Sequence, residues 1–231
     1  MSKTAIIIPI KKYDKSKTRL SPFLDSGERK ELTECLIIDL LEKLLELENS
    51  QTIIVTGERI NCLDKFNDIV IINEINVNGV NNAIELADEF IERNGFDKSI
   101  IIPIDLPLLS TEDIEDIIKF SGKFENGICI VPSRRYDGTN VLLRKHNLII
   151  DTFYDNNSFY NHIKKTVEKK KAVKVFNYEN LMIDLDTIED AMAIINRYNG
   201  MPDSDKIKNK AKYSKSIIFL MEIMKNKVTN I

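Results

Sequence analysis

Short apolar runs alternate with amphipathic segments along almost the whole chain. Buried β-strands are predicted for the runs rich in isoleucine, valine and leucine, at residues 5–10, 52–56, 69–72, 99–104, 128–132, 139–143, 173–176 and 181–183. Helices are predicted from Asp25 onward, at residues 80–93, from Thr111 onward, and at residues 158–169 and 188–198. This alternation is typical of an α/β fold with a mostly parallel sheet. We expect a single three-layer α/β/α domain.

The chain changes character after residue 200. Gly200-Met201-Pro202 is followed by a lysine-rich segment and then by apolar positions that include Ile217, Leu220 and Met224. Such a pattern predicts a terminal helix that packs on the body of the protein or on a second subunit. The expected organisation is a domain at residues 1–200 with a helical extension at residues 201–231, and we expect a homodimer.

Composition excludes several classes of protein. The 231 residues are 43% hydrophobic, which is enough for a continuous core, and the net charge of -3 argues against a dedicated nucleic-acid binder. Cys35, Cys62 and Cys129 are odd in number and far apart, so they support neither a disulfide framework nor a zinc site. No apolar run approaches the length of a membrane span. We expect a cytoplasmic protein without a membrane or nucleic-acid partner.

A basic loop follows the first predicted strand and contains Lys11, Lys17 and Arg19. Loops after parallel strands open onto the ligand-binding edge of such a sheet. There is no glycine between Pro9 and Leu20, so an anion here would be bound by side chains rather than by wrapped backbone amides. A solvated basic loop explains the lysines alone equally well. The planar guanidinium of Arg19 favours phosphate, and several cations together suit a polyphosphate.

Three aspartates follow predicted strands and could hold a metal ion. Asp105 comes directly after the strand at residues 99–104, and Asp184 and Asp186 alternate along the last predicted strand. Carboxylates in such places bind Mg²⁺, often together with substrate phosphates. Alternatively, Asp105 braces the turn that follows it, and one of the other two aspartates caps the next helix.

Three loops have the composition of small-molecule contacts. Gly79 and Asn81 stand at a strand-to-helix junction, where backbone can approach a base or ribose closely. Residues 131–140 bring two arginines, a glycine turn and polar donors together, and Ser158 begins a helix whose amides could receive an anion. Ordinary helix capping explains the first and last of these as well. His162, one turn further along, is more typical of a packed side chain than of a catalyst.

The ordered motifs resemble a known family. They are Ile8-Pro9-Ile10-Lys11, Ser16-Lys17-Thr18-Arg19-Leu20, Gly79-Val80-Asn81-Asn82-Ala83, Pro103-Ile104-Asp105-Leu106-Pro107-Leu108, Gly138-Thr139-Asn140, Ser158-Phe159 with His162, and Asp184-Leu185-Asp186-Thr187 with Glu189-Asp190. In this order they are similar to the 2-phospho-L-lactate guanylyltransferases of coenzyme F(420) biosynthesis, and the similarity extends to about Tyr198. It implies a nucleotide-diphospho-sugar transferase-like fold and a reaction between GTP and a three-carbon phospho-acid.

The resemblance also implies roles for single residues. Thr139 and Ser158 would hold the phospho-acid, which is 2-phospho-L-lactate in most members and phosphoenolpyruvate or 3-phosphoglycerate in related ones. Asp105 would bind Mg²⁺. Where the family often has glycine three residues before the serine, this chain has Asp155, whose backbone could still contact the substrate.

The residue types agree with nucleotidyl transfer. A phosphate monoester is mostly dianionic near pH 7, so its attack on the α-phosphorus of GTP needs no base, and charge neutralisation is the main task of the site. We assign Lys17 and Arg19 to the triphosphate, with Lys11 as a further candidate, and Gly79 and Asn81 to the nucleoside. A glycosyltransferase using a nucleotide sugar and a non-catalytic nucleotide-binding module are the alternatives.

Overall fold

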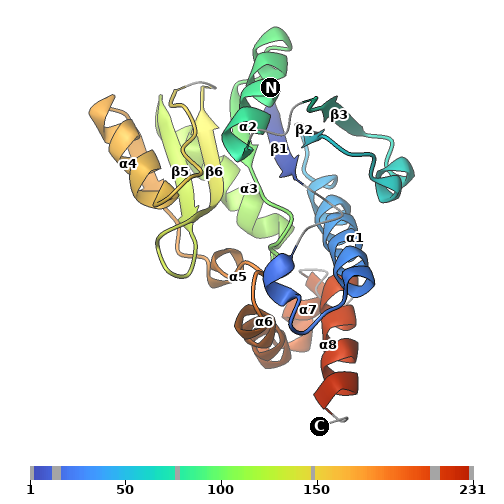
Figure 1. Cartoon of the computed structure of the whole chain (residues 1–231). Coiled ribbons are helices and arrows are strands. Elements are labelled where there is room, and N and C mark those ends of the chain that lie inside the picture. The colour runs from blue at the N-terminus through green and yellow to red at the C-terminus, as the bar shows by residue number, and fades with distance from the viewer. Residues whose placement is uncertain (1–2, 12–16, 76–78, 147–148, 209–213, 229–231) are drawn as a thin grey trace.

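The computed structural model describes residues 3–11, 17–75, 79–146, 149–208 and 214–228. A seven-stranded sheet in the order β3-β2-β1-β4-β6-β5-β7 forms the centre, and helices cover both of its faces (Figure 1). The strands are β1 (Thr4–Ile10), β2 (Ser50–Thr56), β3 (Ile69–Asn73), β4 (Lys98–Ile101), β5 (Gly127–Pro132), β6 (Thr139–Lys145) and β7 (Ala172–Val175). The α-helices are α1 (Ser26–Leu44), α2 (Val80–Arg93), α3 (Thr111–Phe120), α4 (Ser158–Glu168), α5 (Glu179–Met182), α6 (Ile188–Gly200), α7 (Asp203–Lys208) and α8 (Lys215–Val228). The described residues also include the short 3₁₀ turns η2 (Thr18–Leu20), η3 (Asn61–Lys65) and η4 (Ser121–Lys123).

The sheet is mostly parallel, as the sequence predicts. β1 pairs in parallel with β2 and β4, β2 with β3, and β5 with β7. Only β6, among the strands described, runs against its neighbours, because a loop at residues 133–138 is too short for a crossover and returns the chain as a hairpin. The carboxyl ends of β1, β4 and β5 and the amino end of β6 therefore meet at one edge of the sheet.

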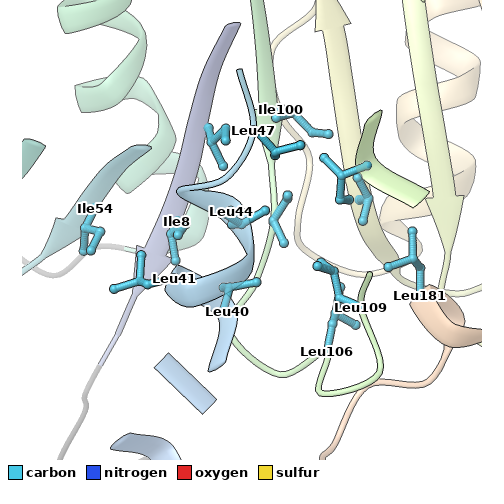
Figure 2. Packing of buried hydrophobic residues seen from close by; sticks show 14 of the residues in the cluster. Ile8, Leu40, Leu41, Leu44, Leu47, Ile54, Ile100, Leu106, Leu109 and Leu181 are labelled. Atoms are coloured by element: carbon cyan, nitrogen blue, oxygen red, sulfur yellow. The ribbon is translucent and has the colours of Figure 1, made fainter. Parts of the chain in front are cut away.

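Alternation along the strands divides the core between the two faces. Ile8 of β1 belongs to the cluster that includes Leu41 and Leu44 of α1 (Figure 2). Ile7 points to the opposite face, where it joins a cluster with Ile84 of α2. α1 begins as predicted, because Asp25 and Glu28 form a reciprocal capping box. The three-layer α/β/α architecture is thus confirmed.

One expected strand ends early, and another does not form. β4 ends at Ile101 rather than at residue 104, because Pro103 has no N–H to donate to the ladder. Residues 181–183 do not form a strand: the chain turns into the short helix α5, and the N–H groups of Leu181 and Met182 both donate to the carbonyl of Tyr178. Leu181 is nevertheless fully buried, because its side chain packs into the core cluster from α5 rather than from a strand of the sheet.

The last helix packs against the body of the same chain. Ile217 and Leu220 of α8 join a third buried cluster with Leu36 of α1 and Ile194 of α6. Asp39 of α1 is buried beneath the start of α8 and accepts hydrogen bonds from the backbone N–H groups of residues 215 and 216 and from the hydroxyls of Ser214 and Ser216, at 2.6–2.9 Å. The start of α8 is therefore held by a carboxylate, which suits the positive end of the helix dipole. None of the helices in the described ranges is long and apolar enough to cross a bilayer.

Replacing Asp39 with alanine is expected to lower the free energy of unfolding by at least about 2 kcal/mol, because several buried donors lose a charged acceptor together. Chemical denaturation would measure the change. Glu42→Ala is the matched control on the same helix, since its carboxylate makes an exposed ion pair with Lys215 and should contribute less than about 1 kcal/mol. Equal losses in the two variants would show that the buried contacts do not hold α8.

Candidate functional site

Two adjoining cavities open at the edge of the sheet where β1, β4 and β5 end. The larger has a volume of about 430 Å³ and the smaller about 250 Å³. Lys11 and Lys17 line the smaller cavity, and Arg19, Ser158 and the aspartates line the larger one. Asp105 and Thr139 line both. The two cavities are therefore parts of one site, with Asp105 and Thr139 at their junction.

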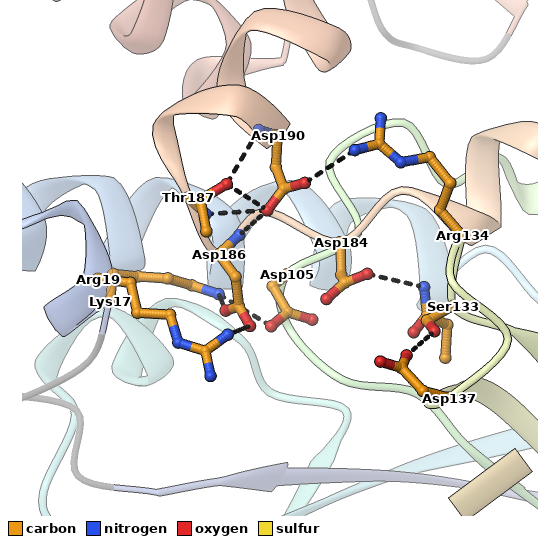
Figure 3. A network of polar contacts seen from close by, with 11 residues as sticks. Lys17, Arg19, Asp105, Ser133, Arg134, Asp137, Asp184, Asp186, Thr187 and Asp190 are labelled. Atoms are coloured by element: carbon orange, nitrogen blue, oxygen red, sulfur yellow. Dashed lines mark hydrogen bonds and ion pairs between the residues drawn. The ribbon is translucent and has the colours of Figure 1, made fainter. Parts of the chain in front are cut away.

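A buried lysine joins two of the predicted acids. Lys17 Nζ lies 2.8 Å from Asp105 Oδ2 and 3.3 Å from Asp186 Oδ1 (Figure 3). The Lys17 side chain is only 6% exposed. Burial alone lowers the pKa of Lys17, but the two carboxylates more than offset this effect and raise the pKa above its ordinary value. The ammonium thus stays charged between the two acids.

Backbone contacts bring these residues together from distant parts of the chain. Lys17 adopts the left-handed conformation before η2, and Leu20, at the end of that turn, is buried in the third cluster. Asp105 follows β4, and its carbonyl accepts a hydrogen bond of 2.9 Å from the N–H of Leu185. This bond joins the segment of Asp184 and Asp186 to the turn after β4, so the acids converge although residues 181–183 form no strand.

Asp184 completes the acidic side of the larger cavity. Burial raises the pKa of its carboxyl group, and the charges of Asp105 and Asp186 raise it further. The amide of Asn140 donates a long hydrogen bond of 3.4 Å to it. A divalent cation bound beside Asp184 would stabilise its charged form. No ready-made cluster of three metal-binding side chains occurs in the part of the chain that the structure describes, and the Lys17 ammonium lies between two of these acids instead.

The sequence left open whether Asp184 or Asp186 caps the following helix, and in the structure neither does. Thr187 is the N-cap of α6, and Asp190 completes the capping box by accepting the Thr187 N–H at 2.9 Å. Asp190 also pairs with Arg134 at 3.5 Å across the larger cavity (Figure 3). Both Asp184 and Asp186 are consequently left for other partners.

Arginines border the opposite wall and the mouth of the site. Arg134 and Arg135 lie in the hairpin loop between β5 and β6, and the loop is held by Ser133, whose hydroxyl donates to Asp137 at 2.8 Å and accepts the Gly138 N–H at 3.0 Å. The Arg19 side chain is 71% exposed and lies 3.7 Å from Asp186. Exposed guanidinium groups of this kind can reach phosphate oxygens on a ligand without first breaking a buried ion pair.

A hydroxyl pair lies at the bottom of the larger cavity. Thr139 Oγ1 is 3.2 Å from Ser158 Oγ and 3.0 Å from Nδ1 of His162. The His162 ring is fully buried, and burial, with a smaller effect of Arg144, lowers its pKa to about 3. His162 is therefore neutral, in agreement with the expectation of a packed side chain.

The α2 junction makes different contacts from those expected. Gly79 has φ 114°, a conformation that favours glycine, and a side chain there would approach Lys11 Nζ to 3.7 Å. Asn81 does not line either cavity; its side chain accepts the Tyr154 N–H at 2.9 Å and donates to Asp155 at 3.2 Å. Asn81 thus links α2 to the loop before α4. The Asp155 carboxylate accepts one of these hydrogen bonds and does not line either cavity.

The similarity of this chain to known proteins agrees with this geometry. The model of the family described as "Guanylyl transferase CofC like" matches residues 4–225. The chain belongs to this family. Among its relatives are the 2-phospho-L-lactate guanylyltransferases of Methanocaldococcus vulcanius, 34% identical over 80% of this chain and 81% of that protein, and of Methanocaldococcus jannaschii, 34% identical over 81% and 80%.

Solved structures support the fold of this CofC-like guanylyltransferase. A protein described as a nucleotide-diphospho-sugar transferase from Desulfovibrio desulfuricans G20 superposes with a TM-score of 0.76 at 16% identity, over 96% of this chain and 95% of that one. A cytidylyltransferase from Leptospira borgpetersenii gives a TM-score of 0.55 at 14% identity, over 99% and 96%. The expected nucleotide-diphospho-sugar transferase-like fold is confirmed.

Most of the expected site residues meet in the CofC-like site. Lys11, Lys17, Arg19, Asp105, Thr139, Ser158, Asp184 and Asp186 line the cavities, whereas Gly79, Asn81 and Asp155 do not. Their individual roles stay predictions. Sequence reasoning missed Tyr154, which lines both cavities. The one sequence feature that could have pointed to Tyr154 is its position next to Asp155 in the loop before α4.

Proposed function

We propose that this guanylyltransferase joins GTP to 2-phospho-L-lactate in coenzyme F(420) biosynthesis, giving lactyl-2-diphospho-5'-guanosine and pyrophosphate. The observation that carries the proposal is the division of the site at Asp105 and Thr139. Cationic side chains line the smaller cavity, and a hydroxyl pair with nearby arginines lines the larger. Such a division suits two anionic substrates that must be brought together.

The smaller cavity is assigned to the triphosphate. Lys11 and Lys17 line it, and Arg19 stands at the mouth of the adjoining one. Positive charges in these places would offset the repulsion between GTP and the phospho-acid and stabilise the departing pyrophosphate. The Lys17 ammonium is held at a fixed place by two carboxylates, so it needs no reorganisation when the substrate binds.

The larger cavity is assigned to the phospho-acid. The Thr139 hydroxyl, held by its hydrogen bond from Ser158, would donate to one anionic end, and Arg134 and Arg135 would offset charge at the other. In the reaction an oxygen of the acid's phosphate forms a bond to the α-phosphorus of GTP, the bond from that phosphorus to the bridging oxygen of the β-phosphate breaks, and pyrophosphate leaves.

Mg²⁺ is the proposed metal ion, held by Asp105 with Asp184 and Asp186. Burial, together with the charges of Asp105 and Asp186, raises the pKa of Asp184, and a divalent cation would stabilise its carboxylate in this place. Mg²⁺ also uses few protein carboxylates when substrate phosphates complete its shell. When bound, it would neutralise phosphate charge and orient the phosphates.

The homodimer expected from the sequence stays a prediction.

Pyrophosphate release tests the proposal. The enzyme is incubated with GTP and Mg²⁺, and with 2-phospho-L-lactate, phosphoenolpyruvate or 3-phosphoglycerate in turn. We expect the fastest release with 2-phospho-L-lactate and none without an acceptor. Faster release with another acid would replace the proposed acceptor. No release with any acid, together with saturable GTP binding that is indifferent to Mg²⁺, would favour a non-catalytic binding module.

A further inference from the structure

Three polar side chains form a chain of hydrogen bonds beneath the larger cavity. Thr139 is 7% exposed, Ser158 3% and His162 0%. Thr139 stands at the amino end of β6, and the other two lie one turn apart on α4. Buried polar groups of this kind have fixed hydrogen-bonding roles, because an unsatisfied group would be costly.

The contact to Phe153 fixes which nitrogen of His162 carries the proton. The backbone N–H of Phe153 donates to His162 Nε2 at 2.9 Å. A ring nitrogen that accepts a hydrogen bond carries no hydrogen, so the single proton of the neutral imidazole resides on Nδ1. Nδ1 therefore donates to Thr139 Oγ1, 3.0 Å away.

Donation by His162 in turn restricts what Thr139 can do. A hydroxyl oxygen has two lone pairs and one proton. One lone pair of Thr139 receives the His162 N–H, and the other receives the Ser158 hydroxyl at 3.2 Å. The hydroxyl proton of Thr139 is then the group that remains for a ligand, and Thr139 borders both cavities.

We propose that His162 is a positioning residue that makes the Thr139 hydroxyl a dedicated hydrogen-bond donor to an anionic oxygen of the phospho-acid. The proposal rests on the proposed function and deepens it. A hydroxyl that can only donate favours carboxylate and phosphate oxygens and disfavours a ligand group that itself must donate. His162 acts here through Thr139 and touches no substrate.

The ring of His162 also packs against Tyr154, with centroids 5.1 Å apart, so a large change at this position would disturb the cavity wall. Two amide variants separate the roles of the two nitrogens. The side-chain nitrogen of asparagine can take the place of Nδ1 and donate to Thr139. Glutamine instead places its amide oxygen near Nε2, where it can accept from Phe153, and leaves Thr139 without its donor.

We expect His162→Gln to raise the KM for 2-phospho-L-lactate by about tenfold or more, since a hydrogen bond to a charged group is weakened. The KM for GTP should stay within about twofold of the unchanged protein. His162→Asn should restore the KM for the acid to within about threefold, although it loses the Phe153 contact. A purely structural role predicts the opposite: similar losses in both variants, and a rise in both KM values.

A double-mutant cycle with Thr139→Val completes the test. If His162 acts through Thr139, His162→Gln should add less than about twofold to the KM of the Thr139→Val protein. If the KM changes of the two single variants multiply in full in the double variant, the proposal is overturned. Calorimetric titration of 2-phospho-L-lactate without GTP should rank the variants in the same order. An unchanged protein that binds the acid but releases no pyrophosphate would refute the proposed function alone; one that does neither would refute both.

Discussion

Asp105→Asn is expected to lower turnover by about two to three orders of magnitude while the fold stays intact, the range seen when one preorganised charge contact is removed from an active site. Asp105 lies where the two cavities meet and is proposed to hold Mg²⁺ between the two substrates. Asparagine keeps the shape of the side chain but removes its charge and much of its affinity for the metal ion. Initial rates of pyrophosphate release at saturating substrates, with a thermal unfolding curve, measure both properties.

The matched control for this change is Asp64→Asn. Asp64 lies in η3, lines neither cavity and forms an ion pair with Arg59, and its side chain is 63% exposed. Loss of the same charge there should leave turnover within about twofold and change the free energy of unfolding by less than about 1 kcal/mol. Near-normal turnover of Asp105→Asn would exclude Asp105 as a metal ligand. A rate that more Mg²⁺ restores would point to weakened metal binding rather than to lost chemistry.

The sequence predicted those parts of the fold that depend on local periodicity. Strand β1 is visible because Ala5 and Ile7 alternate with Ile6 and Ile8, and both faces of a central parallel strand are buried. The error at residues 181–183 has the same origin. Leu181 is buried through α5, and a short apolar run cannot tell a docked turn from a strand.

The candidate site was predictable as far as it follows from sheet topology. Asp105 and the basic loop could be placed together because both follow parallel strands, and such strands end at one edge. Asp186 joins them through the backbone bond between Leu185 and Asp105, which no spacing reveals. The contacts of His162 with Thr139 and of Asn81 with Tyr154 depend on how α4 and its preceding loop pack, so a single sequence could not predict them.

Lys17→Met is expected to reduce turnover by about 100-fold and also to make the stability of the protein depend on Mg²⁺. Removal of the ammonium leaves Asp105 and Asp186 beside Asp184 without the buried cation between them, although the exposed Arg19 stays near Asp186. Breaking a fully buried pair in this way costs about 3–5 kcal/mol. Asp186 is 41% exposed, so solvent should reduce the loss to about 1–3 kcal/mol. Thermal unfolding without nucleotide, with and without Mg²⁺, measures the effect.

The change in Tm with Mg²⁺ distinguishes the contribution of the Lys17 charge to stability from the contribution of its packing. In the unchanged protein the ammonium already offsets the two carboxylates, so Mg²⁺ alone should raise the Tm only slightly. In Lys17→Met the vacated space lies between two negative charges, and a divalent cation bound there should raise the Tm more than in the unchanged protein, by mass action on the folded state. NaCl at equal ionic strength should not reproduce this difference. Equal shifts in the two proteins would mean that Asp105 and Asp186 do not form a shared cation site. If Mg²⁺ restores the Tm of Lys17→Met but not its turnover, the lysine acts on the triphosphate itself as well as neutralising the two carboxylates.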